Sequence, residues 1–188
     1  MSIMENEIIV ASGLPRAGTS LLMQIIGSLG FEMVTDEKRQ ADDHNPRGYY
    51  EYSPVKALCR DNSFLPECRG KAIKIVAPLL SCLDPELAYR IIFIERDLEE
   101  IMASQYRMLN KVRDAHYEAI MKVFENDLIR FRQHLGQLPY CHVLYVQHRG
   151  LILNPRNTVM QIGEFLGIPD PPEQTLNCVD SGLYRNRS

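Results

Sequence analysis

Short apolar runs alternate along the chain with longer segments of helical periodicity. Four runs rich in β-branched residues predict buried parallel strands, at residues 7–12, 71–76, 89–95 and 142–147. Helices are predicted at 19–29, from 98 to about 108, at 111–135 and at 155–166, with a shorter one at 53–62. This alternation predicts an α/β fold, with a three-layer α/β/α arrangement around a central parallel sheet.

Local end signals support several of these helices. Gly30 stands where the C′ residue of the first helix belongs. Asp97 is a good N-cap, and Glu100 lies three residues further on as its capping-box partner. The helix at 111–135 is expected to bury one apolar stripe, made of Ile120, Val123, Phe124, Leu128, Phe131 and Leu135.

A glycine-rich loop, residues 13–18, separates the first strand from the first helix. Strand, glycine loop and helix form a unit that binds anions, because loop N–H groups and the helix dipole converge on one point. The spacing GxxxxGTS is that of a phosphate-binding P-loop, except that Thr19 occupies the lysine position. That change argues against ATP or GTP hydrolysis. Arg16 supplies a cation inside the loop, which favours an anion site over a glycine turn that only joins a core strand to a core helix.

The composition of the chain argues against several classes of protein. A chain of 188 residues is expected to form one domain, 1–188, and a net charge of −3 gives no electrostatic footprint for nucleic acid. No apolar run approaches the roughly 20 residues of a membrane span, and because the first predicted strand begins so early, no signal peptide is expected. The five cysteines lack CxxC or metal spacing, so reduced thiols in a cytoplasmic protein are expected.

The segment 31–50 is polar, with the charge run Asp36-Glu37-Lys38-Arg39 followed by Asp42-Asp43-His44. Its acidic residues and His44 are several times more typical of a solvated loop than of a metal site, and no metal is expected. Residues 45–48 (NPRG) predict a type I turn. This turn leads into Tyr49-Tyr50-Glu51-Tyr52, where one carboxylate lies among tyrosines.

The motif PRAGTS at 15–20 resembles the 5′-phosphosulfate loop of sulfotransferases. Its arginine form looks like that of tyrosylprotein sulfotransferases and small bacterial sulfotransferase-like proteins. The resemblance implies a P-loop-type fold and 3′-phosphoadenosine 5′-phosphosulfate (PAPS) as sulfuryl donor. It assigns the 5′-phosphate to Arg16, Ala17, Gly18, Thr19 and Ser20.

A second motif resembles the family's 3′-phosphate site. There an arginine at a strand end is followed eight residues later by a serine, as Arg96 and Ser104 are in IERDLEEIMASQY. The alternative is a surface arginine paired with Glu99 or Glu100, and a serine tolerated in a helix. Residues 74–80 and 143–155 also look like stretches of cytosolic sulfotransferases.

Three positions depart from the family pattern. The catalytic histidine of the cytosolic enzymes falls on Val76, and the aromatic that helps to hold adenine is replaced by His148. The C-terminal phosphate segment has no clean counterpart, although Arg185 and Arg187 are candidates to supply its cations. A basic tail without such a role is the equal alternative.

Without that histidine, the resemblance to protein-tyrosine and heparan sulfotransferases makes Glu51 the expected base. A solvent-facing glutamate is nearly as well supported, and His44 and Glu32 are weaker candidates. Lys74, at the end of the second strand, is expected to reach the sulfuryl oxygens.

The leading hypothesis is therefore a sulfotransferase that acts on a hydroxyl or amine of a small molecule or glycan. The alternatives are a P-loop kinase acting on a small metabolite, and a non-catalytic nucleotide-binding relative. Thr19 and the Arg96/Ser104 pair weigh against the kinase, and Val76 motivates the non-catalytic relative.

Overall fold

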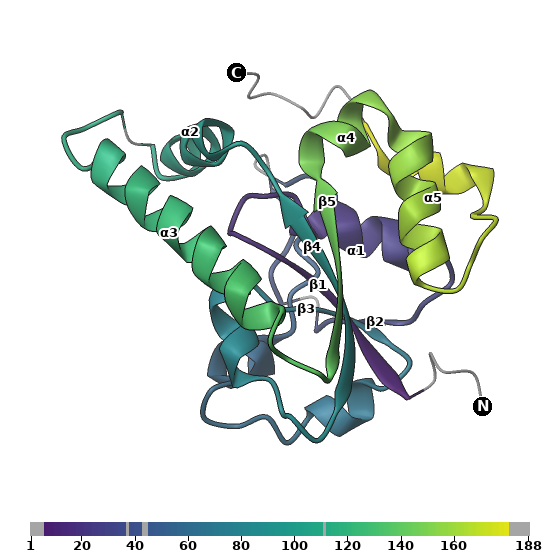
Figure 1. Ribbon diagram of the computed structural model, residues 1–188. Helices are drawn as coiled ribbons and strands as arrows, with labels where there is room; N and C mark the ends of the chain where they lie inside the picture. Colours follow the sequence, from purple (N-terminus) through teal and green to yellow (C-terminus); the bar gives the residue numbers. More distant parts are fainter. Residues whose placement is uncertain (1–5, 37, 43–44, 111, 181–188) are drawn as a thin grey trace.

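The computed structural model describes residues 6–36, 38–42, 45–110 and 112–180. A five-stranded parallel sheet forms its centre, in the order β2-β3-β1-β4-β5 (Figure 1). The strands are β1 (Glu7–Gly13), β2 (Met33–Val34), β3 (Ala72–Lys74), β4 (Ala88–Glu95) and β5 (Cys141–Gln147). The predicted α/β fold is confirmed.

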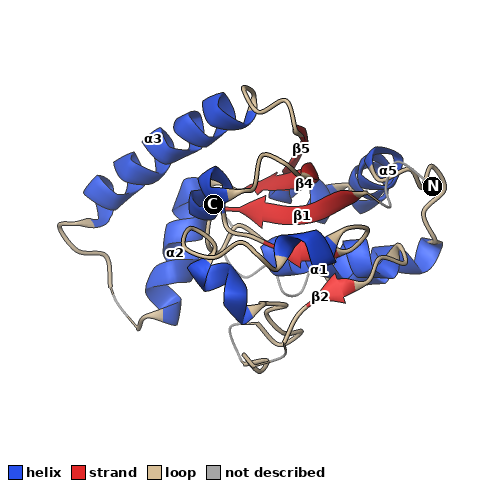
Figure 2. Ribbon diagram, turned by 90° about the horizontal axis from the view of Figure 1, so that it is seen from below, coloured by secondary structure: helices blue, strands red, loops and turns tan. Residues whose placement is uncertain are grey.

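Helices cover both faces of the sheet (Figure 2). The α-helices are α1 (Thr19–Ser28), α2 (Leu98–Met108), α3 (Tyr117–Leu135), α4 (His148–Leu153) and α5 (Pro155–Phe165). Four 3₁₀ segments complete the layers: η2 (Ser53–Ala57), η3 (Leu65–Cys68), η4 (Ala77–Cys82) and η5 (Glu173–Cys178).

Each strand of the sheet centre is buried on both faces, and alternate residues belong to two separate cores. Ile9 and Ala11 of β1 pack with α1, α4 and α5, whereas Ile8 and Val10 pack with η2, η3, η4 and the end of α3. This is why the strands appear in the sequence as continuous apolar runs instead of alternating ones.

The strand order positions the site. The chain leaves β1 through α1 toward β2 on one side, and leaves β4 through α2 and α3 toward β5 on the other. β1 and β4 are neighbours in register, with Gly13 beside Ile94. The loops after β1 and β4 therefore diverge and leave a crevice at the carboxyl ends of these strands, where open α/β sheets bind ligands.

Several helices and strands differ in length from the prediction. The second predicted strand ends at Lys74 instead of residue 76, and the helix predicted at 53–62 is only the 3₁₀ turn η2. The short α4 was not predicted, because six residues containing Gly150 carry no helical period. Val123, expected in the buried stripe of α3, is 55% exposed, whereas the adjacent Phe124 packs against the core.

The expectation of reduced thiols was wrong for two of the five cysteines. Cys59 and Cys82 form a disulfide, with their Cα atoms 4.9 Å apart. Cys59 follows η2 and Cys82 ends η4, and these two segments pack in the same core. Their proximity arises from tertiary packing and leaves no spacing signal in the sequence. Cys68, Cys141 and Cys178 are free.

Two searches of the described residues gave negative results. None of the helices in these ranges combines the length and apolar character needed to cross a membrane. Within the same ranges there is no group of three His, Cys, Asp or Glu side chains that could hold a metal ion. His44 lies outside the described residues, and so do Arg185 and Arg187.

Candidate functional site: an anion pocket at the carboxyl ends of the strands

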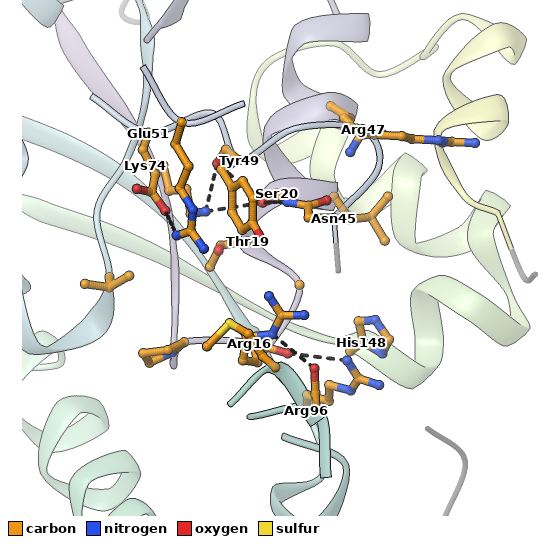
Figure 3. Close-up of a pocket in the computed structure, with 18 of the residues that line it drawn as sticks. Arg16, Thr19, Ser20, Asn45, Arg47, Tyr49, Glu51, Lys74, Arg96 and His148 are labelled. Atoms are coloured by element: carbon orange, nitrogen blue, oxygen red, sulfur yellow. Dashed lines mark hydrogen bonds and ion pairs between the residues drawn. The ribbon is translucent and has the colours of Figure 1, made fainter. Parts of the chain in front are cut away.

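A pocket of about 480 Å³ lies at the carboxyl edge of the sheet. Its walls come from the loop after β1, the first turn of α1, the segment between β2 and η2, the ends of β3 and β4, and helices α2 and α4. Figure 3 shows the labelled side chains gathered around this space from segments far apart in the sequence.

The glycine loop has an unusual backbone. Gly18 is the N-cap of α1 with φ +111°, and a Cβ there would lie 2.8 Å from His148 Cδ2, so both the conformation and the space require glycine. Arg16 also has a positive φ of 70°, a conformation that costs on the order of 1 kcal/mol for a residue with a side chain. Strain of this kind is typical of ligand sites.

The first turn of α1 has no side chain capping its N–H groups. The Ala17 N–H is already used, since it donates to Leu14 O at 3.1 Å. The N–H groups that remain for an anion are therefore those that follow in the chain, at the start of α1.

The two predicted phosphate motifs meet in space. Arg16 Nε donates to Ser104 Oγ at 3.0 Å, and Arg96 Nη1 donates to the carbonyl oxygen of Arg16 at 3.3 Å. Arg96 Nε also pairs with Glu100 Oε2 at 2.8 Å, in a contact almost closed to solvent. The alternative of an Arg96–Glu100 pair is thus present, but the pair is buried and orients the guanidinium within the site.

His148 packs against this group from the first turn of α4. Burial, followed by repulsion from the Arg96 guanidinium, lowers the pKa of His148 to about 4. The imidazole is therefore neutral at neutral pH and presents a flat, uncharged ring beside Gly18.

Lys74 belongs to a second polar cluster across the pocket. Its Nζ donates to Tyr49 O at 2.8 Å and to Ser20 Oγ at 3.2 Å. Asn45 Nδ2 also donates to Ser20 Oγ, at 3.0 Å. Burial lowers the pKa of Lys74 to about 8, Glu51 opposes this shift, and Arg39 and Arg16 add to it. Two of the three Lys74 N–H donors are used, which leaves one for a ligand.

Glu51 lines the pocket beside Lys74. Its carbonyl is held by Thr35 Oγ1 at 3.0 Å and by Asp36 N at 3.2 Å, and its Oε1 accepts from Arg39 Nη1 at 2.8 Å. Its other oxygen, Oε2, has no hydrogen-bond partner within the described ranges. The Glu51 side chain thus lines the pocket while it stays 26% exposed.

Comparisons with known proteins agree with this geometry. A model described as "Sulfotransferase family" matches residues 88–172, which contain the Arg96 and Ser104 motif. The matched segment is less than half of the chain, and it shows a similarity to this family from the start of β4 to beyond α5.

The fold matches that of mouse sulfotransferase SULT7A1 complexed with PAP, at 16% identity and a TM-score of 0.51. The match covers 96% of this chain but 63% of the mouse chain, so the chain spans less than two thirds of the length of that sulfotransferase. A search of curated protein sequences found no match.

Within this fold, the lining residues that were not predicted include Arg39, Asn45, Arg47 and Tyr49. Arg39 was assigned to a solvated charge run, and Asn45 and Arg47 only to a turn, while Tyr49 was named only as a neighbour of Glu51. The turn itself is confirmed by the bond from Gly48 N to Asn45 O at 3.1 Å. The sequence contained one signal that could have pointed to these residues: Asn45 stands at the first position of a turn that directly precedes the tyrosines.

Arg47 joins the turn to the end of the described chain. Its Nη1 donates to Cys178 O at 2.6 Å, and its Nη2 lies 3.4 Å from Asp180 Oδ2. Val76, the position to which the sequence resemblance assigns the histidine of cytosolic sulfotransferases, also lines the pocket. Glu32 is excluded from the site: it is exposed, pairs with Lys71 at 2.8 Å and does not line the pocket.

Proposed function

We propose that this protein transfers a sulfuryl group from PAPS to a hydroxyl or amine of a small molecule or glycan. The convergence of Arg16, Arg96 and Ser104 beside the uncapped start of α1 carries the proposal. Two phosphate motifs 80 or more residues apart meet at one pocket, and a bisphosphate is the ligand that needs two such sites. PAP, which is adenosine 3′,5′-bisphosphate, is a ligand of this class, and it is bound in the mouse sulfotransferase.

The donor set fits the two phosphates separately. Arg16 and the N–H groups of Gly18, Thr19 and Ser20 would hold the 5′-phosphate at the positive end of α1. Arg96 and Ser104 would hold the 3′-phosphate, with Glu100 fixing the orientation of the guanidinium fork. The neutral ring of His148 would lie against the nucleoside.

The cluster that contains Lys74 and Glu51 fits the sulfuryl group of PAPS, where the reaction takes place. The acceptor oxygen or nitrogen attacks sulfur, the bond from sulfur to the 5′-phosphate oxygen breaks, and its electron pair stays on that phosphate. The acceptor proton passes to Glu51, and the remaining N–H of Lys74 stabilises the sulfuryl oxygens. Fixed cations offset the charge on the leaving phosphate, so the step needs no metal.

Incubation with PAPS and an acceptor panel of phenols, alcohols, amines and sugars tests the proposal. Mass spectrometry should detect a product heavier by one SO₃ group, together with an equal amount of PAP. Tight PAP binding without transfer to any acceptor would instead favour a non-catalytic relative. The observation that favours this second candidate function, a non-catalytic relative, is that Val76 and not a histidine lines the pocket at this position.

We also infer that residues 1–188 form one domain, because two cores share the single sheet. A cytoplasmic location stays a prediction. The Cys59–Cys82 disulfide weighs against it, since disulfides persist mainly in oxidising compartments.

A further inference from the structure

Lys74 and Arg39 lie together on one side of the pocket, beside Tyr49, and Arg16 faces them from the other side. Lys74 donates to the Tyr49 carbonyl, and the guanidinium carbon of Arg39 lies 3.4 Å from the centre of the Tyr49 ring. Arg16 and Arg39 both repel the Lys74 ammonium. Glu51 is the single carboxylate close to this group among the pocket-lining residues between 15 and 108. Like charges are brought together in this way where an anion is to be bound.

Arg39 is the member of this group to which the proposed function assigns no role. Its only hydrogen-bonded partner in the described chain is Glu51 Oε1, at 2.8 Å. The side chains of this ion pair are 45% and 26% exposed, and pairs this exposed are weak. The pair can therefore open at little cost.

The stacking contact provides a fixed support for such a movement. The Tyr49 ring is buried, and its hydroxyl donates to the Asp42 carboxylate at 2.8 Å. A guanidinium can slide over an aromatic face while it keeps its cation–π attraction. Arg39 thus has a rigid platform on one side and an exchangeable partner on the other.

We propose that Arg39 is an anion-binding arm of this site, which exchanges Glu51 for the oxygens of the sulfuryl group of the donor. The inference rests on the proposed function, since it names the anion as the group to be transferred. A guanidinium fork suits a group with several oxygens. The exchange frees Oε1 of Glu51 when the donor is in place, so the carboxylate that accepts the proton is then no longer paired with the Arg39 guanidinium.

Calorimetric titration with PAP and with PAPS tests the exchange, because the two ligands differ only in the sulfuryl group. Arg39→Gln should weaken PAPS binding by about tenfold or more, the loss of one charge-assisted contact, and should change PAP binding less than about twofold. Retained PAP binding also shows that the variant is folded. Arg39→Lys should restore part of the PAPS affinity.

Lys38→Gln is the matched control. It removes the same charge one residue away, and Lys38 pairs with Asp36 without lining the pocket. It should leave the affinities for both ligands unchanged.

A double-mutant cycle examines the partner exchange itself. Glu51→Gln removes the group that competes for Arg39, so PAPS binding should tighten by a few fold, and the gain should disappear in the Arg39→Gln background. If Arg39→Gln weakens PAP and PAPS equally, or neither, Arg39 is not the arm, although the PAP site and the proposed function stand. If the wild-type protein binds neither ligand, both proposals are overturned.

Discussion

Arg16 Nε donates a hydrogen bond to Ser104 Oγ at 3.0 Å, across 88 positions of sequence. This bond joins the loop after β1 to the helix after β4, on the two sides of the crevice where the chain connections diverge. The residue proposed for the 5′-phosphate and a residue proposed for the 3′-phosphate are thus coupled directly. The spacing between them is set by the fold and not by the ligand.

Replacing Arg16 by alanine should weaken PAP binding. The contact is charge-assisted, so we expect a loss of about 1.5–3 kcal/mol in binding free energy, measured by calorimetry. The strained φ of Arg16 persists in the variant, so its thermal unfolding should change little. An unchanged PAP affinity would remove Arg16 from the site.

Replacing Arg96 by alanine should discriminate between two ligands. Binding of PAP, which carries a 3′-phosphate, should suffer far more than binding of adenosine 5′-phosphosulfate, which lacks one. The variant removes the buried ion pair between Arg96 and Glu100, so a moderate loss of stability is also expected. Equal losses for both ligands would show that Arg96 supports the fold and not the phosphate.

Replacing Glu51 by glutamine keeps the size of the side chain but removes its ability to accept a proton. Turnover with PAPS should fall by about 10²–10⁴, the usual contribution of a general base, while PAP affinity stays nearly intact. Steady-state rates and calorimetry on the same preparation measure both. Near-normal turnover in the variant would mean that another group, or none, takes the proton.

PAPS affinity should depend on pH through Lys74. Burial lowers the pKa of Lys74 to about 8, so the group is a cation below this pH and loses its charge as the pH rises above it. Affinity should therefore fall between about pH 8 and 10. Lys74→Arg keeps its charge over this range, and its affinity should stay flat there. A parallel fall in the variant would assign the titration to another group.

The Cys59–Cys82 disulfide should stabilise the fold. It closes a loop with a sequence separation of 23, for which loop-closure entropy predicts about 3 kcal/mol. The double variant Cys59→Ser/Cys82→Ser should lose roughly this free energy of unfolding in urea titrations. Wild-type protein treated with a dithiol should approach the same midpoint. If the double variant were as stable as oxidised wild type, the crosslink would contribute nothing.

Some features could be predicted because their causes are local. The Asp97 cap is one: the predicted contact forms, with Glu100 N donating to Asp97 Oδ1 at 3.2 Å. Gly30 is another, since it follows α1 with φ +97°. Caps, turns and buried strands depend on a few neighbouring residues, and these determined most of the fold prediction.

Other features depend on which distant segments meet. Arg39 belongs to a charge run in the sequence, but the fold places it on the Tyr49 ring and beside Glu51. Cys59 and Cys82 become partners only because η2 and η4 pack in one core. Neither contact has a sequence period or spacing, so neither could be predicted before the sheet order was known.

The most direct test of the sulfotransferase account is a pair of calorimetric titrations of the wild-type protein, one with PAP and one with ATP and magnesium. The paired sites at Arg16 and Arg96 predict that PAP binds at one site per chain, far more tightly than ATP. Tight binding of ATP with magnesium and no binding of PAP would contradict the account and support a kinase.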